Sequence, residues 1–82
     1  MSEIAIEVRL FAAARQMVGA GTVSQVLPAG STVQGAVEAL WVAYPALREM
    51  RLRFAVNAAY VDGDAVLHDG DELACIPPVG GG

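Results

Sequence analysis

Apolar and polar residues alternate near the start of the chain, and this pattern predicts the first element of structure. Four apolar side chains occupy every second position, at Ile4, Ile6, Val8 and Leu10. A period of two is typical of a strand that buries one face. Residues 11–18 then favour a short helical turn that Gly19 ends, and residues 22–27 favour a second strand closed by Pro28.

A helix is expected in the middle of the chain. Apolar residues recur there at helical spacing, at Val33, Val37, Leu40, Trp41 and Tyr44. Their side of the helix should face the sheet. Ser31 or Thr32 is expected to cap the helix, and Ser31 with Gln34 has the spacing of a capping box. Pro45 stops the helix, because proline disfavours helical geometry in the residue before it, and residues 46–50 are expected to form one more turn.

The second half of the chain predicts three more strands. They are expected over residues 53–57, residues 60–61 and residues 73–76. Asn, Asp and Gly mark tight turns between them. The order of strand, strand, helix, strand, short strand and strand indicates a small α+β domain. We expect this domain to span residues 1–76 and residues 77–82 to project from it as a tail.

The composition excludes several classes of function. The 82 residues carry a net charge of -4, which argues against a nucleic-acid partner because phosphate binding needs a basic surface. No apolar run approaches the roughly 20 residues of a membrane span, and the start lacks the pattern of a signal peptide. The single cysteine forms no internal disulfide. These features predict one small domain in the cytoplasm, with no membrane partner.

The chain ends in Pro77-Pro78-Val79-Gly80-Gly81-Gly82, directly after the last expected strand. Proline fixes φ and lacks a backbone donor, so the Pro-Pro step is expected to direct the tail away from the sheet. Glycine has no Cβ, so the last residues fit an extended path through a channel too narrow for side chains. The tail is therefore predicted to enter the active site of another protein.

The sequence offers no active site within the domain. His68 is the only histidine and lies beside turn residues, so we expect it at the surface. Cys75 lies in the last apolar strand, where a free cysteine behaves as a small buried hydrophobe, and we expect a structural role for it. One histidine and one cysteine form no zinc cluster, and no glycine-rich loop with Lys and Ser or Thr is present to hold ATP. No cofactor is expected to be bound by this chain.

Four stretches of the sequence resemble a known family. The tail matches an ending of Pro-Pro-Val, one variable residue and Gly-Gly. The other three, in order, are Leu10 to Gly19, Ala55-Val56-Asn57 with Tyr60-Val61, and Asp69-Gly70-Asp71-Glu72-Leu73. Together they are similar to the small subunits of molybdopterin synthase, which are ubiquitin-like sulfur carriers. The resemblance implies a β-grasp fold, in which one main helix packs on one face of a mixed sheet of four to five strands.

The resemblance also implies a reaction at the end of the chain. In this family the last carboxylate, here that of Gly82, is adenylated by a separate activating enzyme that uses ATP and Mg²⁺. Sulfur from a persulfide donor then displaces AMP and leaves a thiocarboxylate. The sulfur-loaded tail enters the large subunit of molybdopterin synthase and gives sulfur to cyclic pyranopterin monophosphate, which builds the dithiolene of molybdopterin. The chain would thus be a sulfur-donor subunit of a heterotetramer, with the catalytic residues on the large subunit.

Docking is expected to use an apolar patch at the base of the tail. The predicted interface residues are Phe11, Arg15, Ile76, Pro77, Pro78 and Val79, and Gly80 and Gly81 are predicted to thread the partner's channel. Phe11 and Ile76 fit the core as well as the interface. The chain departs from the family's common pattern at Ala58-Ala59, where Gly, Glu or Gln often follows the asparagine, and at Ala74-Cys75-Ile76, where some members have bulkier residues.

Three other functions stay open. A sulfur carrier for thiamin thiazole synthesis shares the Gly-Gly end but generally lacks Pro-Pro-Val. A ubiquitin-like modifier would be joined through Gly82 to lysines of other proteins. A plain β-grasp interaction module would not need the tail, so removal of Gly81 and Gly82 separates it from any carrier.

Overall fold

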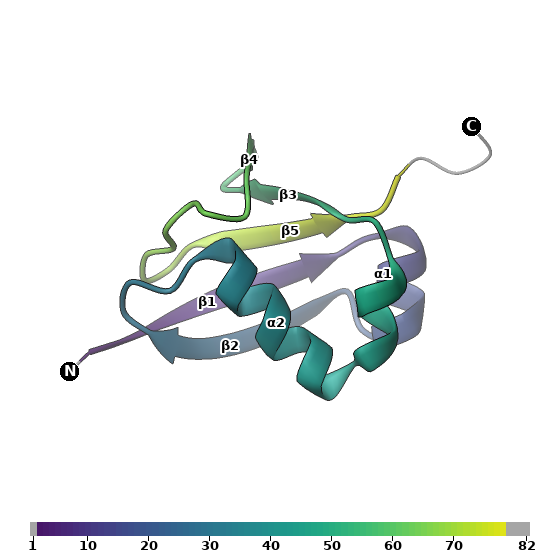
Figure 1. Cartoon of the computed structure of the whole chain (residues 1–82), viewed down its shortest axis with the longest axis horizontal. Helices are drawn as coiled ribbons and strands as arrows, with labels where there is room; N and C mark the ends of the chain where they lie inside the picture. Colours follow the sequence, from purple (N-terminus) through teal and green to yellow (C-terminus); the bar gives the residue numbers. More distant parts are fainter. Residues whose placement is uncertain (1, 79–82) are drawn as a thin grey trace.

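The computed structural model describes residues 2–78, and the elements follow the predicted order along the chain (Figure 1). The strands are β1 (Glu3–Leu10), β2 (Thr22–Pro28), β3 (Arg53–Val56), β4 (Ala59–Val61) and β5 (Glu72–Ile76). The helices are α1 (Ala12–Val18), α2 (Val33–Ala43) and the short 3-10 helix η1 (Pro45–Glu49). Each element expected from the sequence is present, with bounds that differ by about one residue.

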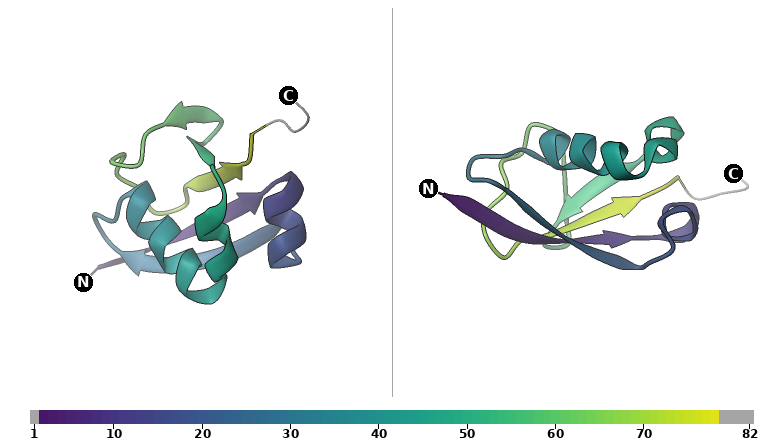
Figure 2. Two further views of the ribbon diagram at one scale, coloured as in Figure 1. Left: turned by 45° about the vertical axis from the view of Figure 1, so that its right-hand side comes forward. Right: turned by 90° about the horizontal axis from the view of Figure 1, so that it is seen from below.

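One mixed sheet carries the fold. Its strand order is β2-β1-β5-β3-β4. β1 and β5 run parallel, whereas the other neighbours are antiparallel. Figure 2 shows α2 across one face of this sheet, with α1 at the end of β1. The other face, which we call the open face, has no helix across it (Figures 1 and 2). The prediction of a small α+β domain with one main helix on one face is confirmed.

The core lies between α2 and the sheet. Alternate residues of β1 are buried as predicted, and the residues between them are exposed. The largest fully buried side chains are Val8, Leu10, Val33, Val37, Leu47, Leu67, Leu73 and Cys75. Each buried Val or Leu side chain contributes about 1.5–3 kcal/mol by leaving water. Trp41 and Tyr44 are only partly buried, at the edge of this core.

The start of α2 corrects one prediction. Thr32 caps the helix, since its Oγ1 accepts a hydrogen bond from the Gly35 N–H at 3.1 Å. The capping box of Ser31 and Gln34 is wrong. The Ser31 hydroxyl donates instead to Pro28 O at 2.6 Å, and Gln34 Nε2 donates to Glu38 at 3.1 Å. Two adjacent hydroxyl residues both fit a cap by sequence, and the path of the chain decides between them.

The turn between β3 and β4 contains backbone strain. Asn57 and Ala58 have φ values of 50° and 72°. Two successive positive φ values match the two-residue hairpin turn that favours Asn-Gly. Asparagine tolerates this conformation, whereas the Cβ of alanine raises its energy. Ala58 therefore stands where glycine fits best.

Replacement of Ala58 by glycine is expected to raise the free energy of unfolding by about 0.5–1 kcal/mol. The relief of the left-handed strain exceeds the entropy that glycine adds to the unfolded chain. The matched control is Ala59→Gly in β4, where glycine should lower stability by a similar amount. Urea unfolding of both variants measures the difference. A lower urea midpoint for Ala58→Gly than for the parent protein would contradict the inference that Ala58 is strained.

Candidate functional site: the carboxyl end of β5

The strand that leads into the tail is the central strand of the sheet. β5 lies between β1 and β3. Leu73 and Cys75 point into the core and are fully buried, while Glu72, Ala74 and Ile76 alternate with them on the open face. A strand paired on both sides is held more firmly than an edge strand. The tail therefore starts from the best-supported strand of the fold.

The start of β5 is fixed by a set of hydrogen bonds around Asp71. Asn57 Nδ2 and the His68 N–H donate to the two carboxylate oxygens of Asp71, at 2.9 and 2.8 Å. The Glu72 N–H donates to Asn57 Oδ1 at 3.0 Å. The bond from His68 N–H, followed by that from Asn57, lowers the pKa of the Asp71 carboxyl from its usual value. The Asp-Gly-Asp-Glu turn thus ties the β3–β4 hairpin to β5, and the His68 side chain is exposed as predicted.

The end of β5 is set by two prolines. The Phe11 N–H donates to Cys75 O at 3.3 Å, and Pro77 and Pro78 have no N–H to continue the ladder. Pro77 is half-buried and Pro78 is exposed. The remaining predicted tail residues, Val79, Gly80, Gly81 and Gly82, lie outside the described residues, so their roles stay predictions.

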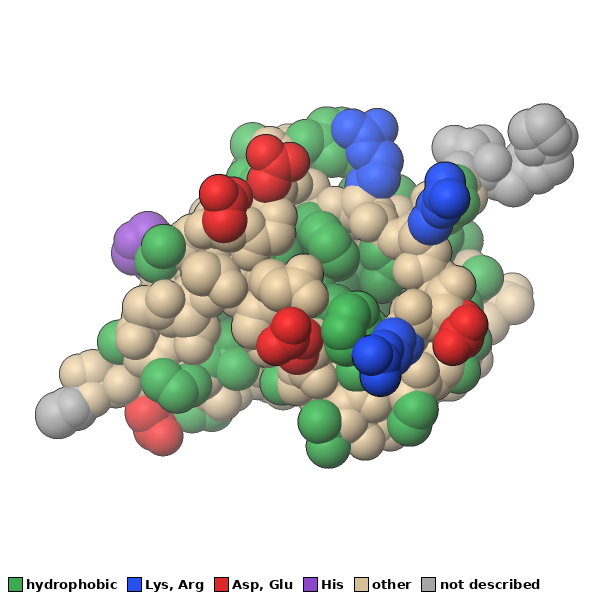
Figure 3. Space-filling view, in the orientation of Figure 1, with side chains coloured by type: hydrophobic (Ala, Val, Ile, Leu, Met, Phe, Trp, Pro, Cys, Tyr) green, Lys and Arg blue, Asp and Glu red, His purple; other side chains and the backbone are tan. Residues whose placement is uncertain are grey.

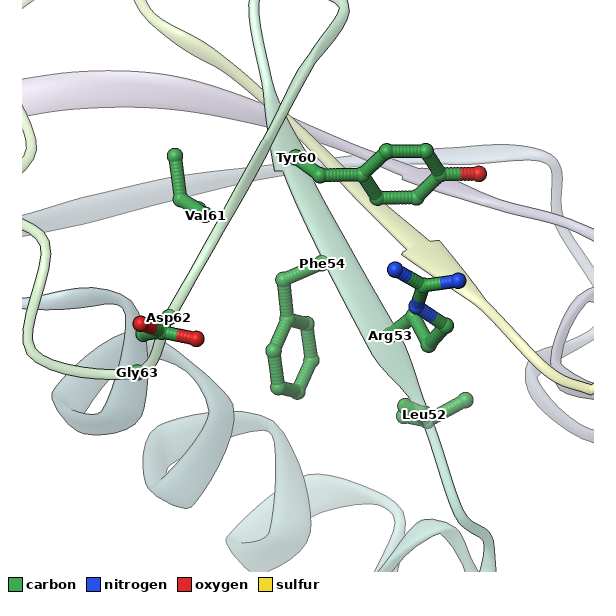
Figure 4. Close-up of a pocket in the computed structure, with 7 residues that line it drawn as sticks. All are labelled: Leu52, Arg53, Phe54, Tyr60, Val61, Asp62 and Gly63. Carbon is green, nitrogen blue, oxygen red and sulfur yellow. The ribbon is translucent and has the colours of Figure 1, made fainter.

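Ile76 lies on the open face among charged and aromatic side chains. Arg53 is its direct partner across the β3–β5 ladder. The Arg53 guanidinium stacks on the Tyr60 ring at 4.3 Å from the ring centre (Figure 4). On the other side of β5, Arg9 lies 5.5 Å from the centre of the Phe11 ring. Two cation–π pairs therefore flank the base of the tail, and the charge of Arg9 is partly balanced by Glu72, whose Oε2 lies 3.8 Å from Arg9 Nη1.

Phe11 and Ile76 were expected to fit either the core or an interface; the structure decides the first, and their role in an interface stays a prediction. Phe11 is 39% exposed and Ile76 is half-buried, so neither belongs to the closed core. Phe11, Ile76 and Pro77 are thus available at the base of the tail. The Arg15 N–H donates to Phe11 O at 3.3 Å, while the Arg15 guanidinium covers Gly21, where a Cβ would meet Nε and Cζ at 3.3 Å.

Three residues of this surface were missed by the sequence analysis as interface candidates: Arg9, Arg53 and Tyr60. The alternation of β1 places Arg9 on its exposed side, and Arg53 is an exposed residue at the start of β3. Their nearness to Ile76 depends on the register of β5 with its neighbours, which single-sequence patterns leave undefined. We call the group of Arg9, Phe11, Arg53, Tyr60 and Ile76 the tail-base surface.

Cys75 is a core residue and not a reactive thiol. It is fully buried, opposite Leu10 in the parallel β1–β5 pair. Burial raises the pKa of its thiol from 9.0 to about 11, because the thiolate loses hydration in apolar surroundings. The expected structural position of Cys75 is confirmed.

The raised thiol pKa predicts a loss of stability at alkaline pH. The folded state holds the thiol proton more tightly than the unfolded chain. The protonated Cys75 thiol therefore contributes fully to the free energy of unfolding below pH 9, and this contribution is lost as pH rises through about 11. We expect the parent protein to lose roughly 2 kcal/mol more than Cys75→Ala over this range. Guanidinium unfolding of both proteins at several pH values measures this. Equal losses in the two proteins would show that Cys75 does not titrate as inferred.

A pocket of about 390 Å³ lies beside the β3–β4 hairpin (Figure 4). Its lining residues are Leu52, Arg53, Phe54, Tyr60, Val61, Asp62 and Gly63. The Phe54 ring points toward α2, away from the Arg53–Tyr60 pair. Within residues 2–78, no group of three His, Cys, Asp or Glu side chains is placed to hold a metal ion. No helix in the same part of the chain is long and apolar enough to cross a membrane.

The fold and the tail-bearing central strand define a small β-grasp protein with a glycine-rich end. The chain belongs to the ThiS family, whose sequence model matches residues 8–82. A curated relative, the molybdopterin synthase sulfur carrier subunit of Arabidopsis thaliana, is 39% identical over 83 residues, which cover 99% of this chain and 86% of the relative. The resemblance inferred from the sequence is confirmed.

Solved structures share the fold. SAMP1, the small archaeal modifier protein 1 of Haloferax volcanii, gives a TM-score of 0.85 at 32% identity over 95% of this chain and 99% of that one. A putative molybdopterin converting factor subunit 1 of Pyrococcus furiosus gives 0.86 at 29% identity over 93% and 99%. In a complex of subunits 1 and 2 of the molybdopterin-converting factor of Helicobacter pylori, the matched chain gives 0.64 at 24% identity over 96% and 100%. The predicted β-grasp fold is confirmed.

Proposed function

We propose that this chain is the sulfur carrier subunit of a molybdopterin synthase and acts in the cytoplasm. The observation that carries the proposal is the relation to the Arabidopsis sulfur carrier subunit over 99% of the chain, together with a tail of Pro-Pro-Val-Gly-Gly-Gly that follows the central strand directly. The tail supplies the reacting group, and the domain supplies the docking surface at the base of the tail.

The proposed chemistry takes place at Gly82. Its carboxylate is an anion at neutral pH and resists nucleophiles. In a partner enzyme, a carboxylate oxygen attacks the α-phosphorus of Mg²⁺-bound ATP and pyrophosphate leaves, which gives an acyl adenylate. The outer sulfur of a donor persulfide then forms a bond to the acyl carbon and displaces AMP. A second thiol cleaves the S–S bond, becomes part of a disulfide with the donor, and releases the thiocarboxylate.

The tail-base surface is proposed to dock on the second, large subunit. Ile76 and Phe11 supply apolar area, and the Arg53 guanidinium, with that of Arg9 beside Glu72, favours an acidic rim on the partner. Both arginines are held by stacking on aromatic rings, which lowers the entropy lost on binding. Within a heterotetramer, Gly80 and Gly81 would pass through the partner's channel, where their missing side chains leave room for the backbone.

A pull-down from native-host lysate tests the proposal. The full chain and a copy that lacks Gly81 and Gly82 are compared, and captured proteins are identified by mass spectrometry. Tail-dependent capture of a molybdopterin synthase large subunit and an adenylating enzyme supports the proposal. Capture of a thiazole synthase in place of the large subunit would transfer the function to thiamin synthesis.

A second candidate function is protein modification. It is favoured by the similarity to SAMP1, a modifier by name, at 32% identity. The same adenylated Gly82 would then react with a lysine amine to form an isopeptide bond and release AMP. In the pull-down, a ladder of covalently modified proteins that disappears without Gly81 and Gly82 would favour this function over sulfur transfer.

A further inference from the structure

The strand β2 forms one edge of the sheet (Figure 1). It lacks the features that usually keep an edge strand from pairing with another chain. It is seven residues long, from Thr22 to Pro28, and contains no charged residue. Proteins commonly protect an edge strand by charge, an internal proline, a bulge or short length. The opposite edge, β4, follows this rule with three residues. β2 has no such protection before Pro28, its last residue. Its pairing with β1 runs without interruption, so it contains no bulge.

The hydrogen-bond pattern shows which groups of β2 face outward. Leu10 N–H donates to Gly21 O beyond one end of the β1–β2 ladder, and Ala29 N–H donates to Ser2 O beyond the other. Bonded and non-bonded pairs alternate in an antiparallel ladder. Every second residue from 21 to 29 therefore bonds to β1, and Thr22, Ser24 and Val26 direct their N–H and C=O groups away from the sheet. No hydrogen bond recorded among residues 2–78 outside the ladder uses these groups.

The flank of α2 above β2 is also free of charge. Gln25 Nε2 donates to Ala36 O at 3.1 Å, so the Ala36 side of α2 lies next to β2. Ala39 and Ala43 follow Ala36 at helical spacing on this side, and both are exposed. Val42 is 84% exposed and follows Glu38 by four residues, so it lies on the outward side of α2 with that carboxylate and is not part of this flank. The surface below α2 in Figure 3 accordingly shows green and tan side chains.

The charged residue of α2, Glu38, lies away from the Ala39 and Ala43 side. A Cβ on Gly63 would lie 3.3 Å from Gln34 Oε1, so the Gln34 side of α2 faces the loop after β4. Gln34 Nε2 donates to Glu38 at 3.1 Å, which places the only ionisable side chain of α2 on that side. β2 and the small apolar flank of α2 therefore form one continuous uncharged surface, which we call the β2–α2 surface.

We propose that the β2–α2 surface binds a second copy of this chain, with the two β2 strands antiparallel about a twofold axis at Ser24. In this register Ser24 pairs with Ser24 of the second copy. Thr22 of each copy pairs with Val26 of the other. All three pairs join outward-facing residues, so each exchanges two main-chain hydrogen bonds. Val26, which is 64% exposed, gains a β-branched cross-strand neighbour in Thr22.

Self-pairing suits this strand because the strand complements itself. In the dimer every outward main-chain N–H from Thr22 to Val26 has a carbonyl acceptor on the other copy. No like charges meet at the contact. The edge is about 23 Å long at roughly 3.3 Å per residue, so it buries less than the roughly 800 Å² per partner of a stable complex. The α2 flank adds area, and the dimer is weak and concentration-dependent.

The dimer leaves the tail-base surface accessible. β1 separates β2 from β5, and the twofold axis sends the two β5 ends in opposite directions. Self-association is thus compatible with the proposed carrier function and does not depend on it. Because each copy carries a net charge of -4, added salt strengthens the dimer by screening repulsion between the copies.

Sedimentation equilibrium and ¹⁵N NMR spectra of the full chain, from about 10 µM to about 1 mM, test the proposal. The expected result is a monomer–dimer equilibrium, with concentration-dependent shifts and slowed amide exchange at Thr22, Ser24 and Val26. Val26→Lys is expected to weaken the dimer at least about tenfold, because it adds charge to the edge, whereas its control Val26→Thr keeps the dimer. Ser24→Pro removes an outward N–H without a β1 bond and is expected to abolish the dimer.

Four results would overturn the proposal. The first is a monomer at the highest concentration. The second is a dimer that withstands both Val26→Lys and Ser24→Pro in folded proteins. The third is a dimer whose concentration-dependent shifts lie on the tail-base surface. The fourth is a β2–α2 surface that binds an extended peptide of another protein while the chain itself stays monomeric.

Discussion

Deletion of Gly82 is expected to abolish sulfur transfer and to leave the fold unchanged. The reacting carboxylate would then belong to Gly81. The extended tail would be shorter by one residue, which is about 3.3–3.6 Å. Because Pro77 and Pro78 fix the exit of the chain, the shortened tail falls short of the adenylating site by that length. Misplacement on this scale costs 100-fold or more in rate. Thiocarboxylate formation with ATP, the matched activating enzyme and a persulfide donor is the measurement.

Two variants serve as controls for this deletion. Gly81→Val keeps the length and the carboxylate but adds a branched side chain, so we expect it also to fail, by blocking the channel. Cys75→Ala keeps the whole tail and should accept sulfur, since its thiol is buried in the core. A folded protein that lacks Gly82 and still accepts sulfur would remove the tail from the mechanism. A folded Cys75→Ala that accepts none would make the cysteine the carrier.

Ile76→Lys is expected to weaken binding to the large subunit about 100-fold. The new ammonium group would lie opposite Arg53, which is the direct cross-strand partner of residue 76. It would also replace an apolar contact near the centre of the tail-base surface, where interface residues contribute most to affinity. Calorimetric titration of the large subunit with each protein gives the change in dissociation constant.

Val66→Lys is the matched control for Ile76→Lys. It introduces the same charge at an exposed valine in the loop before Leu67, where Val66 is 50% exposed. This position lies outside the tail-base surface, so affinity is expected to stay unchanged. Parent-like binding by a folded Ile76→Lys protein would show that docking does not use the base of the tail.

The sequence predicted the elements of the fold because local patterns determine them here. The alternation in β1 and the helical spacing in α2 each define a buried side, and Pro45 and Gly19 end their helices where expected. The helix cap was less certain, because Ser31 and Thr32 are both good caps and the contact of Ser31 with Pro28 depends on the path of the chain after β2. β5 ends at Ile76, and the division into a domain of residues 1–76 and a tail of residues 77–82 stays a prediction.

The site was predicted only where it is local in sequence. Ile76, Pro77 and Phe11 were proposed as interface residues from the tail and from a resembling segment; the structure leaves them outside the closed core near the end of β5, and their role in docking stays a prediction. Arg53 and Tyr60 come from a different hairpin, and their contact with each other and with β5 depends on strand register. Arg9 depends on the parallel pairing of β1 with β5. Patterns within one strand carry no information on such pairings.

The most direct test of the carrier function is the intact mass of the C-terminal peptide of this chain, isolated from native cells under conditions that preserve thiocarboxylates. We predict a population in which one oxygen of the Gly82 carboxylate is replaced by sulfur, and its loss when the activating enzyme is deleted. A Gly82 that carries no sulfur in cells that make molybdopterin, or that is found only in isopeptide bonds to lysine, would contradict the account.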